Sequence, residues 1–577
     1  MRNKEIAEAL YRISELLTLK NENVFKLRAY ERASGIIAAL PEPIEDISAR
    51  GKLTEIPGIG RGIAEKVEEY LSAGKIAYLD ELKASFPEGF FDLMEIPGMG
   101  PKKAKALFDR LKIKDIASLK TAALSGKIRG IEGFGSKSEE NIIKGIALKD
   151  KFSERMLLSD AWYTAKELIE ALSASKFITR ISPAGSLRRR RETVRDIDIL
   201  ASVQKGKEEA VTDQFIKLPG VAKVNAKGPT KASVITGSGL QVDLRIVPET
   251  SFGAALQYFT GSKEHNISLR GLAKDKGLTV NEYGVFKARK TSGALASTTE
   301  EEVYKSLGLA YIPPELRENR GEIEAASKGR LPKLVELKDI KGDTHTHSEY
   351  SDGSDSLEEI AKKAKGLGYE WIVVTDHSQS LKVARGLSIP VLRKKIMEAS
   401  KINASGIGIR LLCGSEVDIL SDGSLDYPDE VLKDLDFVIA SIHTGFTQSE
   451  NQITARIIKA IENPYVNAIG HLTGRLLNER EPYAVDVERV IQAAKKNNKL
   501  LELNAYPNRL DLYDVYCRKA KELGVKICIG TDSHSIDQLG NMSFGVDTAR
   551  RGWLEKKDIL NTMTLEKLMK YLNRGKT

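Results

Sequence analysis

Six of the seven histidines in this 577-residue chain fall between positions 345 and 534. They occur in the contexts DTHTHSEYSDG, VVTDHS, IASIHTG, AIGHL and GTDSH, with small or acidic residues close to the imidazole. Several end an apolar run of the kind that forms a β-strand, as in EWIVVTDH and KICIGTDSH. Imidazole with carboxylate suits zinc or manganese, and α/β barrels collect catalytic groups where their strands end. The pattern predicts a metal site rather than histidines used as core filler.

Two aspartates separated by one residue form a second candidate site, in the segment AGSLRRRRETVRDIDIL (184–200). Asp196 and Asp198 share one face of the predicted strand, while the isoleucines that follow each of them enter the core. Asp243, in LQVDLRIV, alternates with apolar residues and is expected beside them on a neighbouring strand. Converging carboxylates require cations, and two Mg²⁺ ions about 3.5–4 Å apart would neutralise them. A solvated strand edge is the alternative for the aspartate pair alone.

The residues just before these aspartates could hold a phosphate. Gly185 and Ser186 are predicted to turn at the start of a helix, where backbone N–H groups bind anions, and the arginines at 188–191 add positive charge. A Gly-Ser pair ten residues before an aspartate pair is much rarer than the aspartate pair by itself. The combination favours a metal-dependent phosphate site over a strand edge.

A short motif, I-P-G-x-G before a helix, is repeated in the N-terminal part. The copies are LTEIPGIGRGIAEKVEEYL (53–71), LMEIPGMGPKKAKALFDRL (93–111) and, more loosely, IEGFGSKSEENIIKGI (131–146). The glycines that allow a tight hairpin between two helices are Gly58, Gly60, Gly98 and Gly100. The next helix N-terminus then offers free N–H groups to a phosphate of the DNA backbone. A plain packing corner would explain one copy, but the repeat favours DNA binding.

Length and composition limit the remaining possibilities. The chain exceeds the ~250–300 residues at which one core stops growing, so several domains are expected. The net charge of +9 lies in residues 1–340, because acidic and basic side chains balance in 341–577. This charge favours a polyanionic partner, with solubility as the alternative. Cys413, Cys517 and Cys528 form no CxxC pair and leave an odd count, which favours a reducing compartment.

The N-terminal segment MRNKEIAEALYRISELL is charged throughout and lacks the apolar stretch of a signal peptide. No apolar run approaches the ~18 residues that a membrane span needs. These observations predict a soluble cytoplasmic protein.

Taken together, the motifs resemble, nearly end to end, those of the family X DNA polymerases of the bacterial and archaeal type, which carry a C-terminal PHP (polymerase and histidinol phosphatase) domain. The resemblance implies a multidomain fold with an all-α helix-hairpin-helix N-terminal region, an α+β nucleotidyltransferase palm with a thumb, and a C-terminal α/β PHP barrel of (β/α)7 type. The implied domains are a 5′-phosphate-binding, lyase-like helical domain (1–85), a fingers-like helix-hairpin-helix domain (86–152), the palm (153–255), the thumb with the nucleotide-binding subdomain (256–315), a charged linker (316–338) and the PHP phosphoesterase domain (339–577).

In the palm, the resemblance makes Asp196, Asp198 and Asp243 the catalytic, Mg²⁺- or Mn²⁺-binding carboxylates. YFTGSKEHN (258–266) resembles the turn that holds the incoming nucleotide. The implied nucleotide contacts are Gly185, Ser186 and Arg189 at the triphosphate, Tyr258, Phe259 and Gly261 at the sugar, Asn266 at the minor-groove edge of the base, and Arg270 at the template strand.

FKLRAYERASGII (25–37) and the hairpin at 57–66 resemble the family's lyase domain, which uses a lysine Schiff base. The implied residues are Lys66 as the amine, with Lys26, Arg28 and Tyr30 lining a 5′-phosphate pocket. Gly62 stands where active lyases place a second lysine, and Phe25 where they place a histidine. This departure favours 5′-phosphate binding over lyase chemistry.

In the PHP part, the resemblance implies nine ligands for up to three ions of Zn²⁺ or Mn²⁺. The sets are His345, His347, Glu416 and Asp532 for one ion, Glu416, His443 and His471 for a second, and Asp352, His377 and His534 for a third. Because all nine positions hold competent ligands, an active phosphoesterase that acts on a 3′ end is favoured over a degenerate domain.

The implied function is a monomeric DNA-directed DNA polymerase that fills short gaps in DNA repair, including base excision repair, coupled to a metal-dependent 3′-5′ exonuclease. Its partners would be gapped or nicked DNA and dNTPs, with no membrane. One alternative is chiefly a 3′-end-processing nuclease, phosphatase or abasic-site endonuclease with weak polymerase activity. Another is a DNA-end-binding scaffold with both sites silent.

Overall fold

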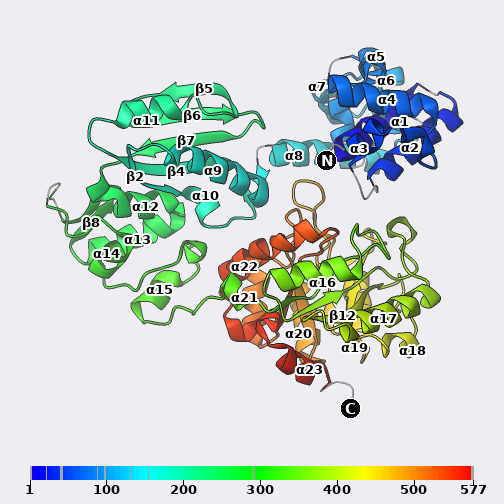
Figure 1. Cartoon of the computed structure of the whole chain (residues 1–577). Helices are drawn as coiled ribbons and strands as arrows, with labels where there is room; N and C mark the ends of the chain where they lie inside the picture. Colours follow the sequence, from blue (N-terminus) through cyan, green and yellow to red (C-terminus); the bar gives the residue numbers. More distant parts are fainter. Residues whose placement is uncertain are drawn as a thin grey trace. The chain divides into compact units, whose positions relative to one another are not determined.

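The computed structural model describes residues 3–20, 22–38, 43–87, 89–96, 99–131, 133–153, 155–288, 290 and 293–573. The chain divides into two compact units, Met1–Glu154 and Arg155–Thr577 (Figure 1). Within the described part of the chain, every helix is too short or too polar to cross a bilayer.

The first unit is helical, as the sequence predicted. Its helices are α1 (Asn3–Leu19), α2 (Val24–Ala38), α3 (Ile44–Ala49), α4 (Arg61–Ala73), α5 (Ala77–Ala84), α6 (Pro101–Leu111), α7 (Ile116–Leu124) and α8 (Ser136–Ser153). In α1 the apolar residues Ile6, Leu10, Ile13 and Leu17 recur every three or four positions and are buried. They form one core with residues of the later helices, including Val67 of α4. This packing fixes the two hairpins that precede α4 and α6.

The second unit begins with a mixed five-stranded sheet. Its strands are β2 (Ile178–Pro183), β4 (Asp196–Val203), β5 (Val221–Lys227), β6 (Lys231–Thr236) and β7 (Gln241–Ile246), in the order β2-β4-β7-β6-β5. Only the central pair β4–β7 is parallel. Helices α9 (Leu158–Ser173) and α11 (Glu208–Phe215) pack their apolar side chains against the sheet. A short pair, β1 (Met156–Leu157) and β3 (Thr193–Val194), and helix α10 (Gly185–Arg188) lie beside it.

A mainly helical region follows the sheet. It contains α12 (Phe252–Thr260), α13 (Lys263–Asp275), the hairpin of β8 (Leu278–Asn281) and β9 (Gly284–Lys287), α14 (Glu300–Ser306) and α15 (Glu322–Ser327). The seventh histidine, His265, is fully buried here. Its ring lies 2.6 Å from Glu322 Oε1 and 3.0 Å from the Tyr304 hydroxyl. This histidine therefore supports the fold and takes no part in the histidine cluster.

The C-terminal part forms a barrel of seven parallel strands in chain order, from β10 to β16. The strands are β10 (Gly342–Asp343), β11 (Trp371–Val374), β12 (Arg410–Asp418), β13 (Phe437–Ser441), β14 (Ala468–Ile469), β15 (Leu500–Asn504) and β16 (Ile527–Gly530). A single parallel bridge between Thr346 and Ser533 joins the two outermost strands and nearly closes the barrel. The seven-stranded α/β class is as predicted.

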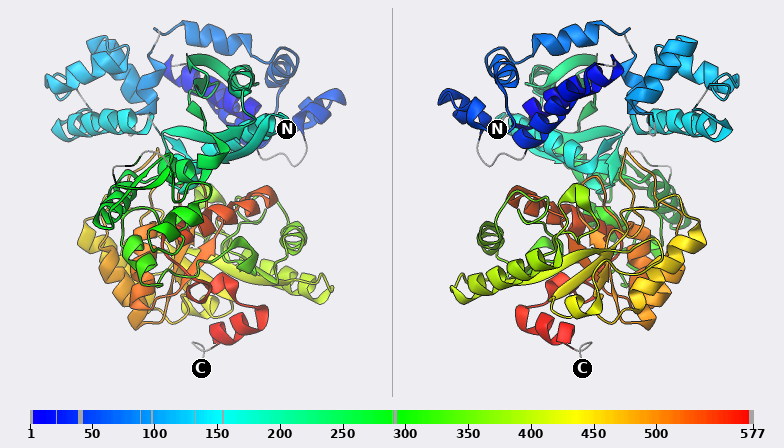
Figure 2. Two further views of the ribbon diagram at one scale, coloured as in Figure 1. Left: turned by 90° about the vertical axis from the view of Figure 1, so that its left-hand side faces the viewer. Right: turned by 90° about the vertical axis from the view of Figure 1, so that its right-hand side faces the viewer.

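Helices cover the outside of the barrel (Figures 1 and 2). They are α16 (Leu357–Gly366), α17 (Ile389–Ala404), α18 (Asp429–Leu432), α19 (Glu450–Glu462), α20 (Val487–Lys496), α21 (Asp514–Leu523) and α22 (Met542–Arg551). The last helix, α23 (Leu565–Asn573), packs Leu568 and Leu572 against the inward residues near the strand starts, such as Trp371 and Phe437. One end of the barrel is thereby closed, and the C-terminal strand ends form its mouth.

The segment 316–338, predicted to be a linker, packs against its surroundings. Arg317 is fully buried and donates to Glu300 at 2.6 Å, and Glu322 is fully buried beside His265. The segment is poor in large apolar residues because its charged side chains find partners inside the fold. It joins the mixed-sheet part to the barrel through ordered contacts.

Candidate active sites

Each of the seven strands of the barrel sends to its mouth a His, Asp or Glu side chain, the types that can bind or orient a metal ligand. The side chains are His345 and His347 after β10, His377 after β11, Glu416 on β12, His443 after β13, His471 after β14, Glu502 on β15, and Asp532 and His534 after β16, with Asp352 in the loop before α16. Parallel strands must end at the same rim of a barrel, so residues almost 200 positions apart meet there. The structure brings all nine predicted ligands together.

Glu416 lies at the centre of this cluster. Its two carboxylate oxygens are 3.3 Å from His345 Nε2, 3.0 Å from His377 Nδ1, 3.3 Å from His443 Nε2 and 2.7 Å from His471 Nε2. Its position between four imidazoles would suit a carboxylate that bridges two cations.

Three groups of side chains are close enough to share an ion. They are His345, His347 and Asp532; His347, Asp352, His377 and His534; and His377, Glu416 and His443. His347 and His377 each belong to two groups, so the ligands are shared more than the three predicted sets imply. His471 enters through its contact with Glu416.

The spacing of these atoms fits a bound cation. His347 Nδ1 is buried without a hydrogen-bond partner, and the nearest Asp352 oxygen is 3.8 Å away. His534 Nε2 lies 3.4 Å from the other Asp352 oxygen. Two ligands at about 2.1 Å from a tetrahedral ion are ~3.4 Å apart, so these gaps suit metal bonds better than hydrogen bonds.

The electrostatics of the mouth also favour cations. Burial opposes protonation of His377 and His443, but neighbouring carboxylates, Glu416 first, raise their pKa values to about 10 and about 9. Burial likewise opposes ionisation of Glu416 and Asp532, yet the histidines lower their pKa values well below the usual range. His347 keeps the neutral ligand form, since burial, His377 and His534 lower its pKa to about 4.

A second layer of side chains, which the sequence analysis missed, orients the ligands. Glu502 Oε1 lies 2.5 Å from His345 Nδ1, and its other oxygen accepts from the backbone N–H of His471 at 2.7 Å. Asp418 contacts His443 Nδ1 in the same way. A carboxylate on one ring nitrogen fixes the imidazole so that the other nitrogen faces the metal. The sequence does hold a signal that could have identified Glu502: the alternation in LLELNAY places its side chain on the inward face of the strand.

A buried ion pair ties two of the ligand loops together. Lys395, on α17, is fully buried and lies 2.8 Å from Asp376, which accepts from the Ser348 N–H at 2.8 Å. Asp376 precedes His377, and Ser348 follows His347. The pair therefore fixes the β10 loop against the end of β11.

The second candidate site lies on the mixed sheet. Asp198 on β4 and Asp243 on β7 are paired in parallel register, and Asp196 is two residues earlier on β4. Burial alternates over the first four residues of β4 and along β7, with the aspartates partly exposed and the residues that follow them buried. Burial and the charges of Asp196 and Asp243 raise the pKa of Asp198 to about 6. The predicted convergence of three carboxylates is present.

Gly185, which precedes the acidic pair, leaves no room for a side chain. Gly185 has φ +59, and an added Cβ would overlap the Asp198 carboxylate. A pocket of about 120 Å³ opens at this point, lined by Asp198, Asp243 and, among others, Lys231, Arg245 and Phe259. The cations beside the carboxylates give the pocket charges of both signs.

The crowding of these carboxylates should be measurable as a cost in stability. Folding raises the pKa of Asp198 from 3.8 to about 6. The contribution of this residue to the stability of the fold is therefore most favourable below pH 3.8 and is lost as pH rises through 6. We expect Asp198→Asn to raise the free energy of unfolding of the metal-free protein near pH 8 by ~1–3 kcal/mol. Thermal unfolding in EDTA at pH 5 and pH 8 measures this. A gain at pH 5 as large as that at pH 8 would contradict it.

Among the predicted nucleotide contacts, Phe259 lines this pocket. Tyr258 and Phe259 stand edge to face with ring centroids 5.2 Å apart, and Arg245 lies over the Phe259 ring. Asn266 accepts from Gln257 and donates to the Tyr258 carbonyl. Arg270 is exposed on α13.

The turn from Gly185 to Arg189 is held from two sides. Ser186 is partly exposed in α10. Arg189 Nη1 donates to the Thr260 carbonyl at 2.5 Å, and Gly261 follows so closely that an added Cβ would lie 3.2 Å from Arg189 Nη1. The Arg189 side chain is thus fixed beside the predicted nucleotide-binding turn.

The arginine run at 188–191 is not a free positive patch. Arg188 pairs with Glu300 at 2.6 Å, Arg189 with Glu318 at 3.1 Å and Arg190 with Asp547 at 3.5 Å, while Arg191 lies 3.9 Å from Glu318. The interpretation that the whole run adds charge for a phosphate was wrong, because partners distant in the sequence neutralise most of it.

In the first unit, three of the predicted phosphate residues cluster around Tyr78. Lys26 Nζ donates to the Tyr78 hydroxyl at 2.7 Å, and Lys66 Nζ lies 5.0 Å from the ring centroid. Tyr30 is buried, and burial with the nearby Tyr78 raises its pKa to about 12. Arg28 is exposed. Tyr78 is a residue that the sequence analysis missed.

Three of the four hairpin glycines lie in the turns that precede α4 and α6. Gly58 has φ +99 and lies against Ile36, while Gly60 and Gly100 directly precede α4 and α6. Gly98 lies outside the described residues. Lys66 lies within the first two turns of α4, and its side chain belongs to the cluster around Tyr78.

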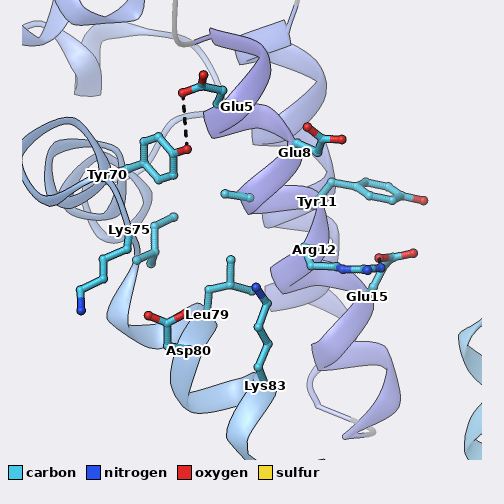
Figure 3. A pocket seen from close by; sticks show the side chains of 13 residues that line it. Glu5, Glu8, Tyr11, Arg12, Glu15, Tyr70, Lys75, Leu79, Asp80 and Lys83 are labelled. Atoms are coloured by element: carbon cyan, nitrogen blue, oxygen red, sulfur yellow. Dashed lines mark hydrogen bonds and ion pairs between the residues drawn. The ribbon is translucent and has the colours of Figure 1, made fainter. Parts of the chain in front are cut away.

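A pocket of about 650 Å³ lies elsewhere in this unit, between α1, α4 and α5 (Figure 3). Both acidic and basic side chains line its walls, and Arg12 pairs with Glu15 at 2.8 Å. The Tyr70 hydroxyl reaches Glu5 across it at 3.5 Å. Arg12 with Glu15 and Tyr70 with Glu5 thus satisfy one another in this pocket.

Comparisons with known proteins match every part of the chain. The matching family models are a helix-hairpin-helix domain (1–76), a SAM-like helix-hairpin-helix tandem (90–148), the DNA polymerase beta thumb (255–318) and the PHP domain (343–506). The DNA polymerase/3′-5′ exonuclease PolX of Bacillus subtilis (strain 168) is 41% identical over 577 residues, which covers 100% of both chains.

The barrel also has relatives of its own. A probable phosphatase of Thermoanaerobacter sp. (strain X514) is 33% identical over 249 residues, covering 41% of this chain and 95% of that protein. A probable phosphatase of Acetivibrio thermocellus is 32% identical over 243 residues, with the same coverage.

Proposed function

Because the chain belongs to the family X DNA polymerases that carry a PHP domain, we propose that it fills short gaps in DNA during repair and trims 3′ ends, each at its own metal centre. The observation that carries this proposal is the convergence of two sets of candidate metal ligands, the aspartates of the palm (the mixed sheet) and the nine residues at the mouth of the PHP barrel. A scaffold protein would not need either set.

In the palm, Asp196, Asp198 and Asp243 would hold two Mg²⁺ ions. Bound there, the ions would lower the pKa of a primer 3′-hydroxyl and neutralise the leaving pyrophosphate. The raised pKa of Asp198 means that this carboxylate must lose its proton before it can serve as a ligand. Incorporation should accordingly weaken as pH falls through 6.

The nucleotide would occupy the pocket beside these carboxylates. Arg189 and the turn at Gly185 and Ser186 would bind the triphosphate, and the aromatic pair Tyr258 and Phe259 would contact the sugar. Asn266 would reach the base, and the exposed Arg270 the template. Gapped or nicked DNA and dNTPs are thus the proposed partners of a monomeric enzyme.

In the barrel, the nine ligands would hold Zn²⁺ or Mn²⁺ and position a phosphodiester. Such ions supply a hydroxide nucleophile at neutral pH. Glu502 and Asp418 would keep two of the imidazoles oriented, and the neutral His347 would remain available as a ligand. The relatives described as probable phosphatases favour a 3′-phosphate as a second substrate of this site.

One experiment separates these activities. A labelled primer on a gapped duplex is incubated with Mg²⁺ and dNTPs, or with Mn²⁺ without dNTPs, and in parallel with a 3′-phosphate terminus. We expect extension in the first case, stepwise shortening in the second and release of phosphate in the third. No extension under any metal would reject the polymerase assignment, and an intact primer in Mn²⁺ would reject the exonuclease.

The cluster around Tyr78 should recognise a 5′-phosphate. We expect gapped duplex with a 5′-phosphate to bind more tightly than the same duplex with a 5′-hydroxyl by ~1–3 kcal/mol, the scale of charge-assisted hydrogen bonds. Lys26→Ala with Lys66→Ala should remove this difference, whereas Lys83→Ala, beside the pocket of Figure 3, should keep it. Fluorescence titration provides the affinities.

Equal affinity of the parent protein for both ends would reject the phosphate site. Borohydride trapping on a 5′-deoxyribose phosphate substrate separately tests Lys66 as a Schiff-base amine. We expect no trapped adduct, because Gly62 and Phe25 lack the functional groups of active lyases.

A further inference from the structure

The palm is joined to the barrel directly behind the predicted triphosphate site. Arg551, at the C-terminal end of α22 in the barrel, has a side chain that is only 4% exposed. Its Nη1 donates to the backbone carbonyl of Arg189 at 2.7 Å and to Glu318 Oε1 at 3.0 Å. A barrel residue therefore touches both the main chain of the palm residue Arg189 and that residue's acidic partner.

Glu318 is shared by the two arginines. Its Oε1 accepts from Arg189 Nε at 3.1 Å as well as from Arg551 Nη1. Burial opposes ionisation of Glu318, but Arg551, Arg189 and Arg191 outweigh burial and lower its pKa. The carboxylate is charged and holds both side chains in place.

The other arm of Arg551 is anchored within the barrel. Its Nη2 donates to Asp514 Oδ2 at 2.7 Å, and Arg320 donates to the same oxygen at 3.0 Å. A planar guanidinium can span Asp514 on one side and Glu318 on the other, whereas a single ammonium cannot. The orientation of Arg189 is thereby set by a rigid element of the barrel.

We propose that Arg551 is a positioning residue for nucleotide binding: through Glu318 and the main chain of Arg189, it holds the Arg189 guanidinium in the geometry that receives the triphosphate. The inference rests on the proposed polymerase function. With Nε bound to Glu318 and Nη1 to the Thr260 carbonyl, Arg189 is left with Nη2 for a phosphate. Affinity for the incoming dNTP thus depends on the barrel, although no metal ligand of the barrel takes part.

The neighbouring Arg550 provides a matched control. It donates to Glu315 at 2.7 Å and to the Val335 carbonyl at 2.9 Å, so it makes a comparable ion pair on the same helix. Neither of these contacts involves Glu318 or Arg189. Loss of Arg550 weakens packing around α22 without releasing the triphosphate arginine.

The test compares Arg551→Lys and Arg550→Ala in the full-length protein. We expect Arg551→Lys to raise the KM for dNTP by roughly tenfold with a smaller change in kcat, because ground-state binding of the triphosphate is lost. DNA affinity and Mn²⁺-dependent 3′ trimming should stay within about twofold of the parent protein. Arg550→Ala should leave the KM for dNTP within the same range.

Several outcomes would overturn the inference. A folded Arg551→Lys protein with the parental KM would do so, and so would an equal rise in Arg550→Ala, which would reduce Arg551 to one of several interface contacts. If Arg551→Lys fails to fold, Asp514→Asn is read by the same criterion, since it releases the second arm of Arg551 and leaves Glu318 in place. A parent protein that incorporates no nucleotide would overturn the proposed polymerase function and this inference with it.

Discussion

Replacing Asp243 by alanine is expected to abolish nucleotide incorporation, by ~10²–10³-fold or more, and to leave 3′ trimming at the parental rate. Asp243 faces Asp198 across the parallel pair β4–β7, so one substitution removes one of the three carboxylates proposed to hold the metal ions. The barrel ligands come from other strands and keep their contacts. Extension in Mg²⁺ and shortening in Mn²⁺ are measured on one labelled primer.

The fold should survive this change, because removing one of three crowded carboxylates relieves repulsion. Asp196→Ala with Asp198→Ala should give the same loss. Asp213→Asn is the control, since Asp213 pairs with Lys227 and takes no part in the acidic cluster. An Asp243→Ala protein that extends primers at the parental rate would refute the assignment of the palm.

The acidic cluster was predictable because a strand alternates its side chains between two faces. The patterns around Asp196, Asp198 and Asp243 identified partly exposed aspartates between buried residues, and the register of β4 and β7 brings them together. The histidines could likewise be placed at strand ends from their apolar contexts. Periodicity of this local kind can be recognised from the sequence alone.

Partnerships between charged residues could not be predicted in this way. Glu502 contacts His345, which lies 157 residues away in the sequence, and Arg551 contacts Glu318, which lies 233 residues away. A buried carboxylate looks like a surface carboxylate in the sequence when its partner is far away along the chain. The arginine run was misjudged for this same reason, because carboxylates far away along the chain pair with it. The charged segment 316–338 likewise finds partners inside the fold.

Replacing His345 and His347 together by alanine is expected to stop 3′ trimming and to remove at least one equivalent of bound metal, while gap filling in Mg²⁺ continues. His345 contacts Glu416, and His347 contacts Asp532 and stacks between His377 and His534 with centroids 4.4 Å apart on both sides. The pair contributes to two of the three candidate ion groups. Metal analysis of purified protein and the two primer reactions measure the outcome.

The same site should respond to pH and to chelators. Metal must displace protons from His377 and His443, whose pKa values without metal are about 10 and about 9, so acid favours the proton and alkali favours the metal. Trimming should therefore fall as pH drops from 8 to 6 and recover when Mn²⁺ is raised. The Asp243→Ala protein, which keeps all nine barrel ligands, should show the same dependence. If the His345→Ala, His347→Ala protein degrades primers at the parental rate and retains its metal, the nuclease lies elsewhere and the barrel has only a structural role.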